Sequence, residues 1–577
     1  MGMIKQLSGC IRQYKKDTIL TPLFVIGEVA LEVIIPLIMA NLIDYGINAG
    51  DMNYVIKTGI ILIILCMASL FFGAMSGKYA ASAAAGFSAN LRHDMYYKVQ
   101  EYSFKNIDKF STASIVTRLT TDITNIQLAF MMIIRIAIRS PIMLVCAFFA
   151  VLSINKKIAL IYLCVIPVLG IGLYLIMSHA HPIFKRVFKK YDKLNAIVQE
   201  NLRGIRVVKS FVREDHEIEK FEESSKDIYM DFTKVEKLLA FNMPLMQLCV
   251  YSCILLSLWL GAKFIVGGVM LTGNLVSIMT YTMQMLMSLM ILSMVFVMVA
   301  MSKTGCERAC EILNEVPDIK DNENPIYEVK DGSVSFKNVD FSYTDNEEKL
   351  SLKNVNLEFK SGETIGIIGG TGSSKSTFVQ LIPRLYDVTS GSVEVGGIDV
   401  RNYDIETLRN AVAVVLQKNV LFSGTIKENL RWGDENATDE ELVRVCRLAC
   451  ADEFIEQFPD KYDTYIEQGG TNVSGGQKQR LCIARALLKK PKILILDDST
   501  SAVDTATDAK IRKAFAEEIP DTTKFIIAQR ISSVQDADKI IVLNNGEINA
   551  VGTHEELLKS NPIYREVYES QTKGGEE

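Results

Sequence analysis

The sequence predicts a multidomain membrane protein in which an all-α six-helix transmembrane domain is followed by an α/β domain. Hydrophobic residues make up 49% of its 577 residues, and the long apolar stretches lie within about the first 300. From about residue 331 short β-rich runs appear, and strand and helix patterns alternate to about residue 570. The net charge of −5 is small for this length and favours neither nucleic acid nor an acidic ligand as a partner.

Six apolar stretches are each about 20 residues long or longer, which is the length a helix needs to cross a bilayer. An even number of spans places both ends of the domain on one side of the membrane. Lysine and arginine gather in the long loops near 90–130 and 180–240, so we expect these loops and both termini to be cytosolic. The stretches lie at about 18–42, 55–77, 134–154, 158–178, 246–268 and 275–300.

Residues 1–17 (MGMIKQLSGCIRQYKKD) predict a helix that lies on the inner membrane surface. Ile4, Leu7 and Ile11 recur at helical spacing, and the lysines and arginines occupy the opposite face. A secretory signal peptide is the alternative. The following span contains Glu28, Glu32 and Pro36 and has no small-residue cleavage site, which disfavours a signal peptide.

Three groups of residues within the predicted spans have more than one interpretation. Glu28 and Glu32 lie one turn apart on the first span, where a carboxylate is costly unless it meets a cavity or a partner, so they face substrate or form a structural pair. Arg135 and Arg139 open the third span, and we expect them to reach back to the inner interface. A methionine stripe along the last span indicates either plain packing or a cavity for varied apolar ligands. The stripe comprises Met283, Met287, Met290, Met294, Met298 and Met301.

Eleven cysteines are scattered along the chain without the spacing of a secreted disulfide framework. This pattern indicates a reducing compartment for the part outside the membrane. Cys306 and Cys310 are one helical turn apart. Two thiols without nearby histidines are typical of ordinary helix residues, so we assign no metal site to them.

A phosphate-binding loop is predicted where the strand ETIGII runs into GGTGSSKST and then into the apolar helix FVQLIPRLY. Lys375 is expected to reach the β and γ phosphates of a nucleotide, and the Ser376 hydroxyl is expected to bind Mg²⁺. The loop departs from the pattern G-x-x-x-x-G-K-[ST], because Ser374 stands where a glycine is expected. The loop residues are Gly369, Gly370, Thr371, Gly372, Ser373, Ser374, Lys375, Ser376 and Thr377.

Further motifs follow this loop in a fixed order: Gln417 in VVLQKNVLFSGTIKENL, then VSGGQKQR, then ILILDD, STSAVD and TKFIIAQR. With them the chain resembles the ABC transporters, in particular exporters with six membrane spans fused ahead of one nucleotide-binding domain. The resemblance covers essentially the whole chain. It includes FKNIDKFSTASIVTRLTTD and QENLRGIRVVKSFVRED, which look like the cytosolic extensions that carry the coupling helices of that family.

The resemblance implies how the chain is divided and where it resides. We expect an integral, multi-pass protein of a bacterial inner or cell membrane, with a cytosolic α/β P-loop ATPase domain that binds ATP and Mg²⁺. The expected parts are an interfacial elbow helix at 1–17, a transmembrane domain at 18–305 with coupling loops near 104–122 and 205–222, a linker at 306–330, and an ABC nucleotide-binding domain at 331–577.

The resemblance also implies roles for individual residues. Tyr343 stacks on adenine, because an aromatic face can do so. Ser376, Gln417 and Asp497 arrange Mg²⁺ and water, and Gln417 reports nucleotide to the coupling helices. ATP in this family lies between the phosphate loop of one domain and the signature of another, so a second half-transporter is required. The signature residues here are Ser474, Gly475, Gly476 and Gln477, and Asp504 carries communication between the two sites.

Three departures from the family pattern belong to one composite site, and the signature that serves the other site is intact apart from Val473 in place of leucine. Asp498 stands where the family has a catalytic glutamate, and its arm is shorter by about 1.3–1.5 Å, where a misplacement of about 1 Å can cost ~10²-fold in rate. Gln529 replaces the expected histidine, and an amide cannot carry charge or shuttle a proton. Ser374 is strained by about 1–3 kcal/mol if its backbone requires positive φ.

The sequence therefore predicts the degenerate-site subunit of a heterodimeric, multidrug-type exporter. The partner chain supplies the missing glutamate and histidine, and the signature of this chain completes the productive site. The expected cargo is a hydrophobic or amphipathic small molecule, lipid or peptide, and membrane lipid is the other contact. Two alternatives are a homodimeric exporter that hydrolyses slowly with Asp498 and Gln529, and a nucleotide-gated membrane regulator that does not pump.

Overall fold

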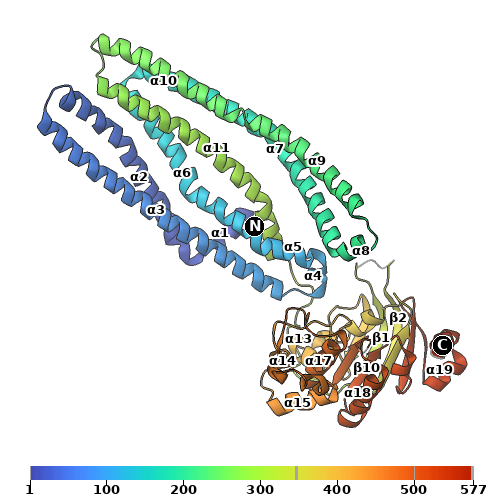
Figure 1. Ribbon diagram of the computed structural model, residues 1–577. Helices are drawn as coiled ribbons and strands as arrows, with labels where there is room; N and C mark the ends of the chain where they lie inside the picture. The colour runs from blue at the N-terminus through green and yellow to red at the C-terminus, as the bar shows by residue number, and fades with distance from the viewer. Residues whose placement is uncertain (1, 345–348, 500, 574–577) are drawn as a thin grey trace. The chain divides into compact units, whose positions relative to one another are not determined.

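The computed structural model describes residues 2–344, 349–499 and 501–573. They form two compact units, whose helices and strands are labelled in Figure 1. The first unit consists of Met1–Gln100 and Thr112–Glu315, and the second of Glu101–Ser111 and Val316–Glu577. A short piece of the N-terminal half therefore belongs to the C-terminal unit.

The first unit is entirely helical. Among the described residues, six helical segments are long and apolar enough to cross a membrane, and they run from Arg12–Ile47 to Thr272–Asn314. Each holds one of the six predicted apolar stretches to within about two residues, which confirms the predicted fold class for this half. The helices are α1 (Met3–Gly9), α2 (Lys15–Asn41), α3 (Met52–Gln100), α5 (Thr112–Thr117), α6 (Ile123–Ile154), α7 (Lys156–Arg203), α8 (Ile205–Ser210), α9 (Glu214–Leu239), α10 (Asn242–Val266) and α11 (Thr272–Asn314), with 3-10 or π turns at Arg12–Tyr14, Leu42–Ile47 and Arg118–Asp122.

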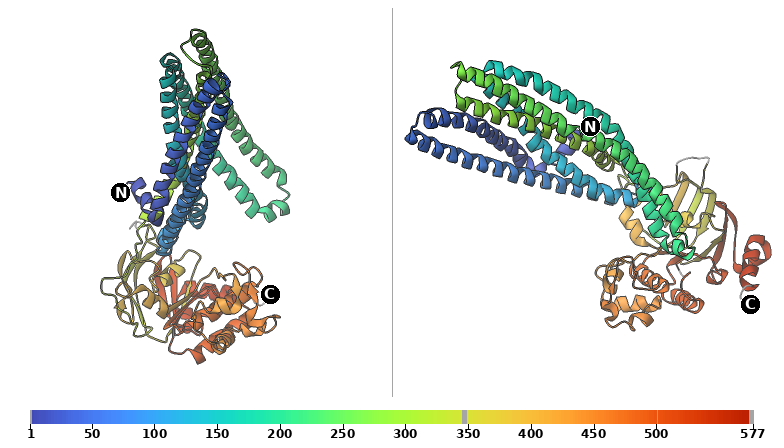
Figure 2. Two further views of the ribbon diagram at one scale, coloured as in Figure 1. Left: turned by 90° about the vertical axis from the view of Figure 1, so that its left-hand side faces the viewer. Right: turned by 45° about the horizontal axis from the view of Figure 1, so that its top comes forward.

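Several of these helices are longer than a bilayer requires. Helix α3 has 49 residues, which at 1.5 Å per residue is about 74 Å, against about 30 Å of hydrocarbon. Helices α7 and α9 are joined by α8 and run together as a pair in both views of Figure 2. These helices therefore continue well beyond the membrane.

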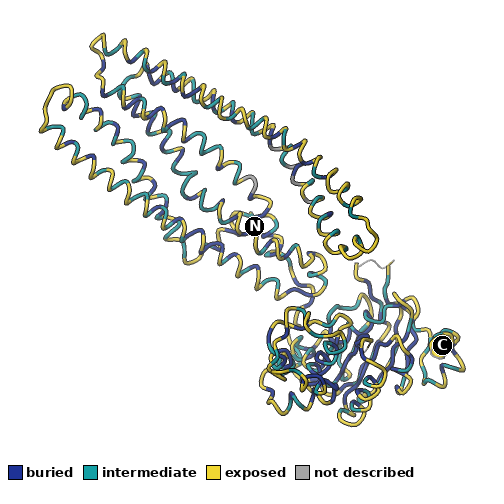
Figure 3. The backbone as a smooth tube through the Cα atoms, viewed as in Figure 1, coloured by how far each residue is buried: buried dark blue, intermediate teal, exposed yellow. Residues whose placement is uncertain are grey.

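Burial differs between the two units, as the dark-blue and yellow segments of Figure 3 show. Many apolar side chains of the spans are exposed, such as Ile63 and Leu70 on α3. In the second unit the central strands are buried along their whole length. Exposed apolar residues on a helix of this length are typical of a surface that faces lipid or another chain.

The second unit contains two main sheets. The four-stranded sheet is antiparallel, in the order β2-β1-β4-β5. The six-stranded sheet has the order β12-β11-β3-β10-β9-β6, and all of its pairings are parallel except that of the edge strand β12. The strands are β1 (Val334–Phe341), β2 (Leu352–Phe359), β3 (Thr364–Gly369), β4 (Ser390–Val395), β5 (Ile398–Asp399), β6 (Val412–Val415), β7 (Gly424–Thr425), β8 (Tyr465–Ile466), β9 (Ile493–Asp497), β10 (Thr523–Ile527), β11 (Lys539–Asn544) and β12 (Glu547–Gly552).

Helices cover the parallel sheet, and parallel strands joined through helices give the predicted α/β class. One apolar core lies between the sheet and helices such as α17 and α18, and a second lies beneath the antiparallel sheet. The helices are α12 (Lys375–Gln380), α13 (Ile405–Ala411), α14 (Ile426–Leu430), α15 (Asp439–Leu448), α16 (Asp452–Ile455), α17 (Gly475–Leu488), α18 (Thr505–Glu518), α19 (His554–Ser560) and α20 (Pro562–Lys573).

The short helix α4 (Phe104–Phe110) is the N-terminal piece that belongs to the second unit. Ser103 caps it, with its side chain accepting from the Asn106 backbone N–H. The Ser103 hydroxyl also donates to Asp318, and the Asn106 amide donates to the Val316 carbonyl at 3.3 Å. Helix α4 is thus attached to the segment at which the chain enters the α/β domain.

At the end of the first unit opposite α1, helix α11 begins in close contact with the end of α2. The Gly273 backbone N–H donates to Asp44 Oδ1 at 2.7 Å, and a Cβ at Gly273 would collide with the carbonyl oxygen of Ala40. We therefore expect Gly273→Ala to destabilise this unit by about 1–3 kcal/mol. The fraction of purified protein that stays monodisperse after heating should fall.

Gly59→Ala on α3 is the matched control, because a Cβ at Gly59 meets no atom within 4 Å. It should behave like the wild type in the same heating experiment. Equal resistance of the two variants would contradict the close contact between α2 and α11.

Candidate functional site

The carboxyl ends of the parallel strands meet at one edge of the six-stranded sheet. Strand β3 ends at Gly369, β9 at Asp497 and β10 at Ile527, and the register aligns Asp497 with Ile527. Because each predicted motif follows directly on one of these strand ends, the edge gathers the phosphate loop, the aspartate pair and Gln529.

The phosphate loop contains three positions with strict backbone demands. A Cβ at Gly369 would collide with the Leu543 carbonyl oxygen of β11. Gly372 has φ +81°, and Ser374 has φ +70° and ψ 26°, in the left-handed region. The positive φ that strain at Ser374 requires is therefore present, and the Ser374 side chain makes no capping hydrogen bond that would offset it.

Lys375 lies folded over its own loop. Its Nζ donates to the carbonyl oxygens of Gly369 at 2.7 Å and Gly370 at 2.9 Å. Burial lowers the pKa of Lys375, and the neighbouring Asp497 and Asp498 oppose that shift. Phosphate oxygens at the same place would take over the role of these carbonyls and would also favour the charged lysine.

Ser376 and Asp497 form the pair that suits a magnesium ion. The Ser376 hydroxyl donates to Asp497 Oδ1 at 3.0 Å, and Asp497 is 5% exposed. Burial raises the pKa of the Asp497 carboxyl, with the Ser376 hydrogen bond opposing it. A divalent cation here would relieve the cost of burying the charge, and hydroxyl and carboxylate oxygens are the ligands Mg²⁺ prefers.

Two amides hold one oxygen of the Asp498 carboxylate. Its Oδ2 accepts from Gln529 Nε2 at 2.7 Å and from Gln417 Nε2 at 3.4 Å. Its backbone N–H donates to the Ile527 carbonyl at 3.0 Å, and its φ is +48°. All three residues of the predicted catalytic set therefore meet at one carboxylate oxygen.

Tyr343 follows β1 and keeps one side available to a ligand. Its side chain is 41% exposed, and its hydroxyl lies 2.9 Å from Thr377 Oγ1 at the start of α12. The ring of Phe341 meets it edge to face, with centroids 4.8 Å apart. Tyr343 is thus positioned beside the phosphate loop with an accessible aromatic face.

The signature residues lie at the start of α17 and make their own local contacts. Ser474 caps the helix and exchanges hydrogen bonds with Gln477 in a capping box. A Cβ at Gly476 would lie 2.8 Å from the Ala502 carbonyl oxygen. Among the described residues, no hydrogen bond or ion pair joins Ser474–Gln477 to the phosphate loop. The structure therefore does not bring this predicted group together with the rest of the site.

Asp504 caps α18. Its Oδ1 accepts from the Thr507 backbone N–H at 2.9 Å, and this hydrogen bond lowers the pKa of Asp504. It lies at the end of the turn that follows β9. A carboxylate that is both ionised and exposed at this position can form a contact with another domain.

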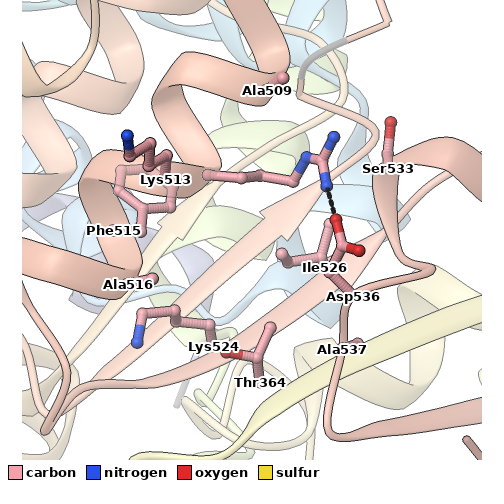
Figure 4. Close-up of a pocket in the computed structure, with 11 residues that line it drawn as sticks. Thr364, Ala509, Lys513, Phe515, Ala516, Lys524, Ile526, Ser533, Asp536 and Ala537 are labelled. Atoms are coloured by element: carbon pink, nitrogen blue, oxygen red, sulfur yellow. Dashed lines mark hydrogen bonds and ion pairs between the residues drawn. The ribbon is translucent and has the colours of Figure 1, made fainter.

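A separate cavity of about 250 Å³ lies at the opposite edge of the sheet, beside α18 and the beginning of β10. Figure 4 shows Lys513, Lys524 and Asp536 among its lining residues. None of the predicted nucleotide-site residues lines it.

Within the membrane unit, the structure corrects the expectation for Arg139. Its Nη2 donates to both carboxylate oxygens of Glu32, at 2.7 and 2.8 Å, and its Nε lies 3.8 Å from Glu28 Oε1. Arg139 therefore pairs with α2 instead of reaching to the interface. In a low-dielectric environment the free-energy cost of three charges is lower when they are paired than when they are apart. The sequence of one span does not show which charges lie on the neighbouring helix, so this pairing could not be predicted.

The methionine stripe faces away from the core of the membrane unit. Met283, Met287 and Met294 are exposed, and Met290 and Met298 are half-buried. The side chain of Met301 lies outside the described part of the chain. Plain packing within the unit does not account for the exposed members, and their role in a cavity stays a prediction.

The sequence reasoning missed Tyr386, which touches both Tyr343 and α4. Its ring centroid lies 5.2 Å from that of Tyr343, and its hydroxyl donates to Asp108 Oδ2 at 2.9 Å. Asp108 lies in FKNIDKF, a motif that was recognised, but nothing in the pattern pointed to Tyr386.

Both halves of the chain match families of known proteins. Residues 18–289 match the family model of the ABC transporter transmembrane region, and residues 352–501 match that of the ABC transporter. The uncharacterized ABC transporter ATP-binding protein YfiB of Bacillus subtilis is 37% identical over 95% of each chain. Its counterpart Rv1273c of Mycobacterium tuberculosis is 32% identical over 97% of each. The structure of a bacterial Atm1-family ABC exporter with ATP bound has a TM-score of 0.82 and 22% identity, over 97% of this chain and 98% of that one.

The exposed face of Tyr343 makes a specific prediction. Tyr343→Ala should weaken ATP binding by about fivefold to a hundredfold, because a stacked base contributes ~1–3 kcal/mol. Tyr343→Phe keeps the ring and should bind within about threefold of the wild type, since it loses only the hydrogen bonds of the hydroxyl to Thr377 and Gln380. Titration with a fluorescent ATP analogue measures both. An equal loss in the two variants would contradict the stacking role.

Proposed function

Because the chain belongs to the ABC transporter family, we propose that it is one subunit of a two-chain exporter whose own nucleotide site holds ATP rather than cleaving it. The chain is a multi-pass membrane protein with a cytosolic nucleotide-binding domain, and it is an ABC-type ATPase and translocase. In this division of labour, the nucleotide site of this chain holds ATP and the site of a partner chain hydrolyses it.

The pairing of Gln529 with Asp498 is the observation that carries the proposal. A general base must accept a proton from water with a free lone pair within hydrogen-bond reach. Here Oδ2 of Asp498 already accepts from Gln529 at 2.7 Å and from Gln417 at 3.4 Å, so of the two carboxylate oxygens Oδ1 is the one left to serve a water molecule. Asp498 is also one methylene shorter than the glutamate of the family pattern, so its carboxylate falls short of the attacking water.

Gln529 and Ser374 also lower the rate of ATP hydrolysis expected at this half-site. Gln529 can donate to a γ-phosphate, but it carries no charge at any pH and therefore stabilises the transition state less than a protonated histidine. Ser374 introduces left-handed strain at the base of α12, in the loop that must close around phosphate. All three residues belong to the half-site that this chain contributes.

The residues for binding ATP and Mg²⁺ are nevertheless in place. Lys375 and the glycines of the loop hold the phosphates, Tyr343 stacks on the base, and Ser376, Asp497 and Gln417 hold the metal. When bound, Mg²⁺ neutralises charge on the β and γ phosphates. Binding without turnover is the expected behaviour of such a half-site.

The signature of this chain serves the other site. Its capping box uses the backbone N–H groups of Ser474 and Gln477, so those of Gly475 and Gly476 are the ones that can contact a γ-phosphate held by a second chain. The second chain must then provide a glutamate and a histidine. Closure of the two nucleotide domains favours one global state, and the coupling loops transmit it to the spans.

Export of a hydrophobic or amphipathic substrate is the transport activity we propose. It is supported by the resemblance in fold to a bacterial exporter and by the exposed methionines of α11, whose flexible thioethers suit varied apolar ligands. Arg139 of α6 forms a structural ion-pair cluster with Glu28 and Glu32 of α2.

Two substitutions should differ strongly in how far they reduce ATP turnover by the purified two-chain complex. Asp498→Asn keeps the shape and should change turnover by less than about twofold, because this half-site contributes little hydrolysis. Gly476→Asp should reduce turnover by ~10²-fold, because the side chain would displace the signature from the partner's nucleotide. A coupled-enzyme assay of phosphate release measures both rates.

The isolated chain provides the control. It should hydrolyse ATP very slowly, even where it self-associates. A strong loss in Asp498→Asn would show that Asp498 is a working base, and substantial turnover by the chain alone would show that the chain acts as a homodimer.

A further inference from the structure

Tyr386 lies between helix α4 and the exposed aromatic ring of Tyr343, and all three belong to the second compact unit. Toward α4, its hydroxyl donates to Asp108 Oδ2 at 2.9 Å and its ring centroid is 6.0 Å from that of Phe104. Toward the nucleotide site, its ring stands at 87° to that of Tyr343 with centroids 5.2 Å apart. One side chain therefore connects the two.

The hydrogen bond between Tyr386 and Asp108 runs from the phenol hydroxyl to the carboxylate. Burial raises the pKa of the Tyr386 hydroxyl, and Asp108 raises it further. The hydroxyl therefore stays protonated and remains a donor to the carboxylate. A charge-assisted hydrogen bond of this kind is stronger than one between neutral groups, so it can hold α4 in a defined position.

Tyr343 is held on the side of the phosphate loop as well. Its hydroxyl contacts Thr377, the residue that follows Ser376, and its ring packs edge to face on Phe341. The exposed face of the ring is the part that remains for a base. A base that stacks there contacts the Tyr343 ring, whose other faces are held by neighbouring side chains. Tyr386 is one of these neighbours.

Two of the described sets of contacts, each called an anchor, attach helix α4 to the domain, and they reach different parts of it. Ser103 and Asn106 attach it to Asp318 and Val316, outside the nucleotide site. Phe104 and Asp108 attach it to Tyr386, which contacts Tyr343. The second anchor is the one that a bound base can influence.

We propose that Tyr386 is a positioning residue that transmits occupancy of the base position of this nucleotide site to α4, independently of the phosphates. The inference rests on the proposed function only in requiring that the site bind ATP. For a site that holds nucleotide, a contact with the base reports occupancy whether or not the γ-phosphate is present. The route through Gln417, in contrast, ends at the phosphates.

Hydrogen–deuterium exchange of the peptide that contains residues 104–110 tests this in the purified two-chain complex. Saturating Mg-ATP and Mg-ADP should each slow exchange in α4 by about twofold to tenfold, the effect of steadying one hydrogen bond. Magnesium tripolyphosphate, which has the phosphates and no base, should leave α4 unchanged while it still protects the phosphate loop. Equal protection of α4 by tripolyphosphate would overturn the proposal.

Two variants separate the contact between Tyr386 and Asp108 from the binding of ATP. Tyr386→Phe keeps the ring beside Tyr343 and removes the donor to Asp108, so ATP should bind within about twofold of the wild type while the protection of α4 is lost. Asp108→Ala removes the acceptor from the α4 side and should give the same loss. Full protection in both variants would overturn the proposal. ATP turnover at the partner site does not enter this readout, so a failure of the proposed division of labour would leave the result unaffected.

Discussion

The parallel register of β9 and β10, which aligns Asp497 with Ile527, is the constraint on which the nucleotide site depends. It places the turn after β9 beside the segment after β10, so that Asp498 and Gln529 meet although 31 residues separate them. The neighbouring strand β3 pairs with β10 in the same direction and delivers the phosphate loop to the same edge. A shift of one residue in this register would turn Asp498 away from Gln529.

Much of this site could be predicted from the sequence, because the phosphate loop and the aspartate pair each follow directly on an apolar strand. The replacements at Asp498, Gln529 and Ser374 could be identified as well. The amide contacts on Asp498 could not, because they arise from strand order and register rather than from local spacing. The same holds for Tyr386, whose partners Tyr343 and Asp108 lie 43 and 278 residues away in the sequence.

In the membrane unit, too, part of the structure could be predicted from the sequence and part could not. Apolar stretches of sufficient length predicted its six spans, since length and composition decide whether a helix can cross a bilayer. The expectation that Arg139 reaches to the interface was wrong, because the carboxylates that bind it lie on another helix. Charges within a span are stabilised by neighbours that only the packed structure reveals.

The central claim is that the half-site built on Asp498 and Gln529 holds ATP without cleaving it. The most direct test is to incubate the two-chain complex with Mg-ATP, remove free nucleotide rapidly, and identify what stays bound. The account predicts that one uncleaved ATP is retained for each pair of chains, and that mutation of Lys375 to alanine abolishes this retention. Recovery of ADP alone would contradict the account.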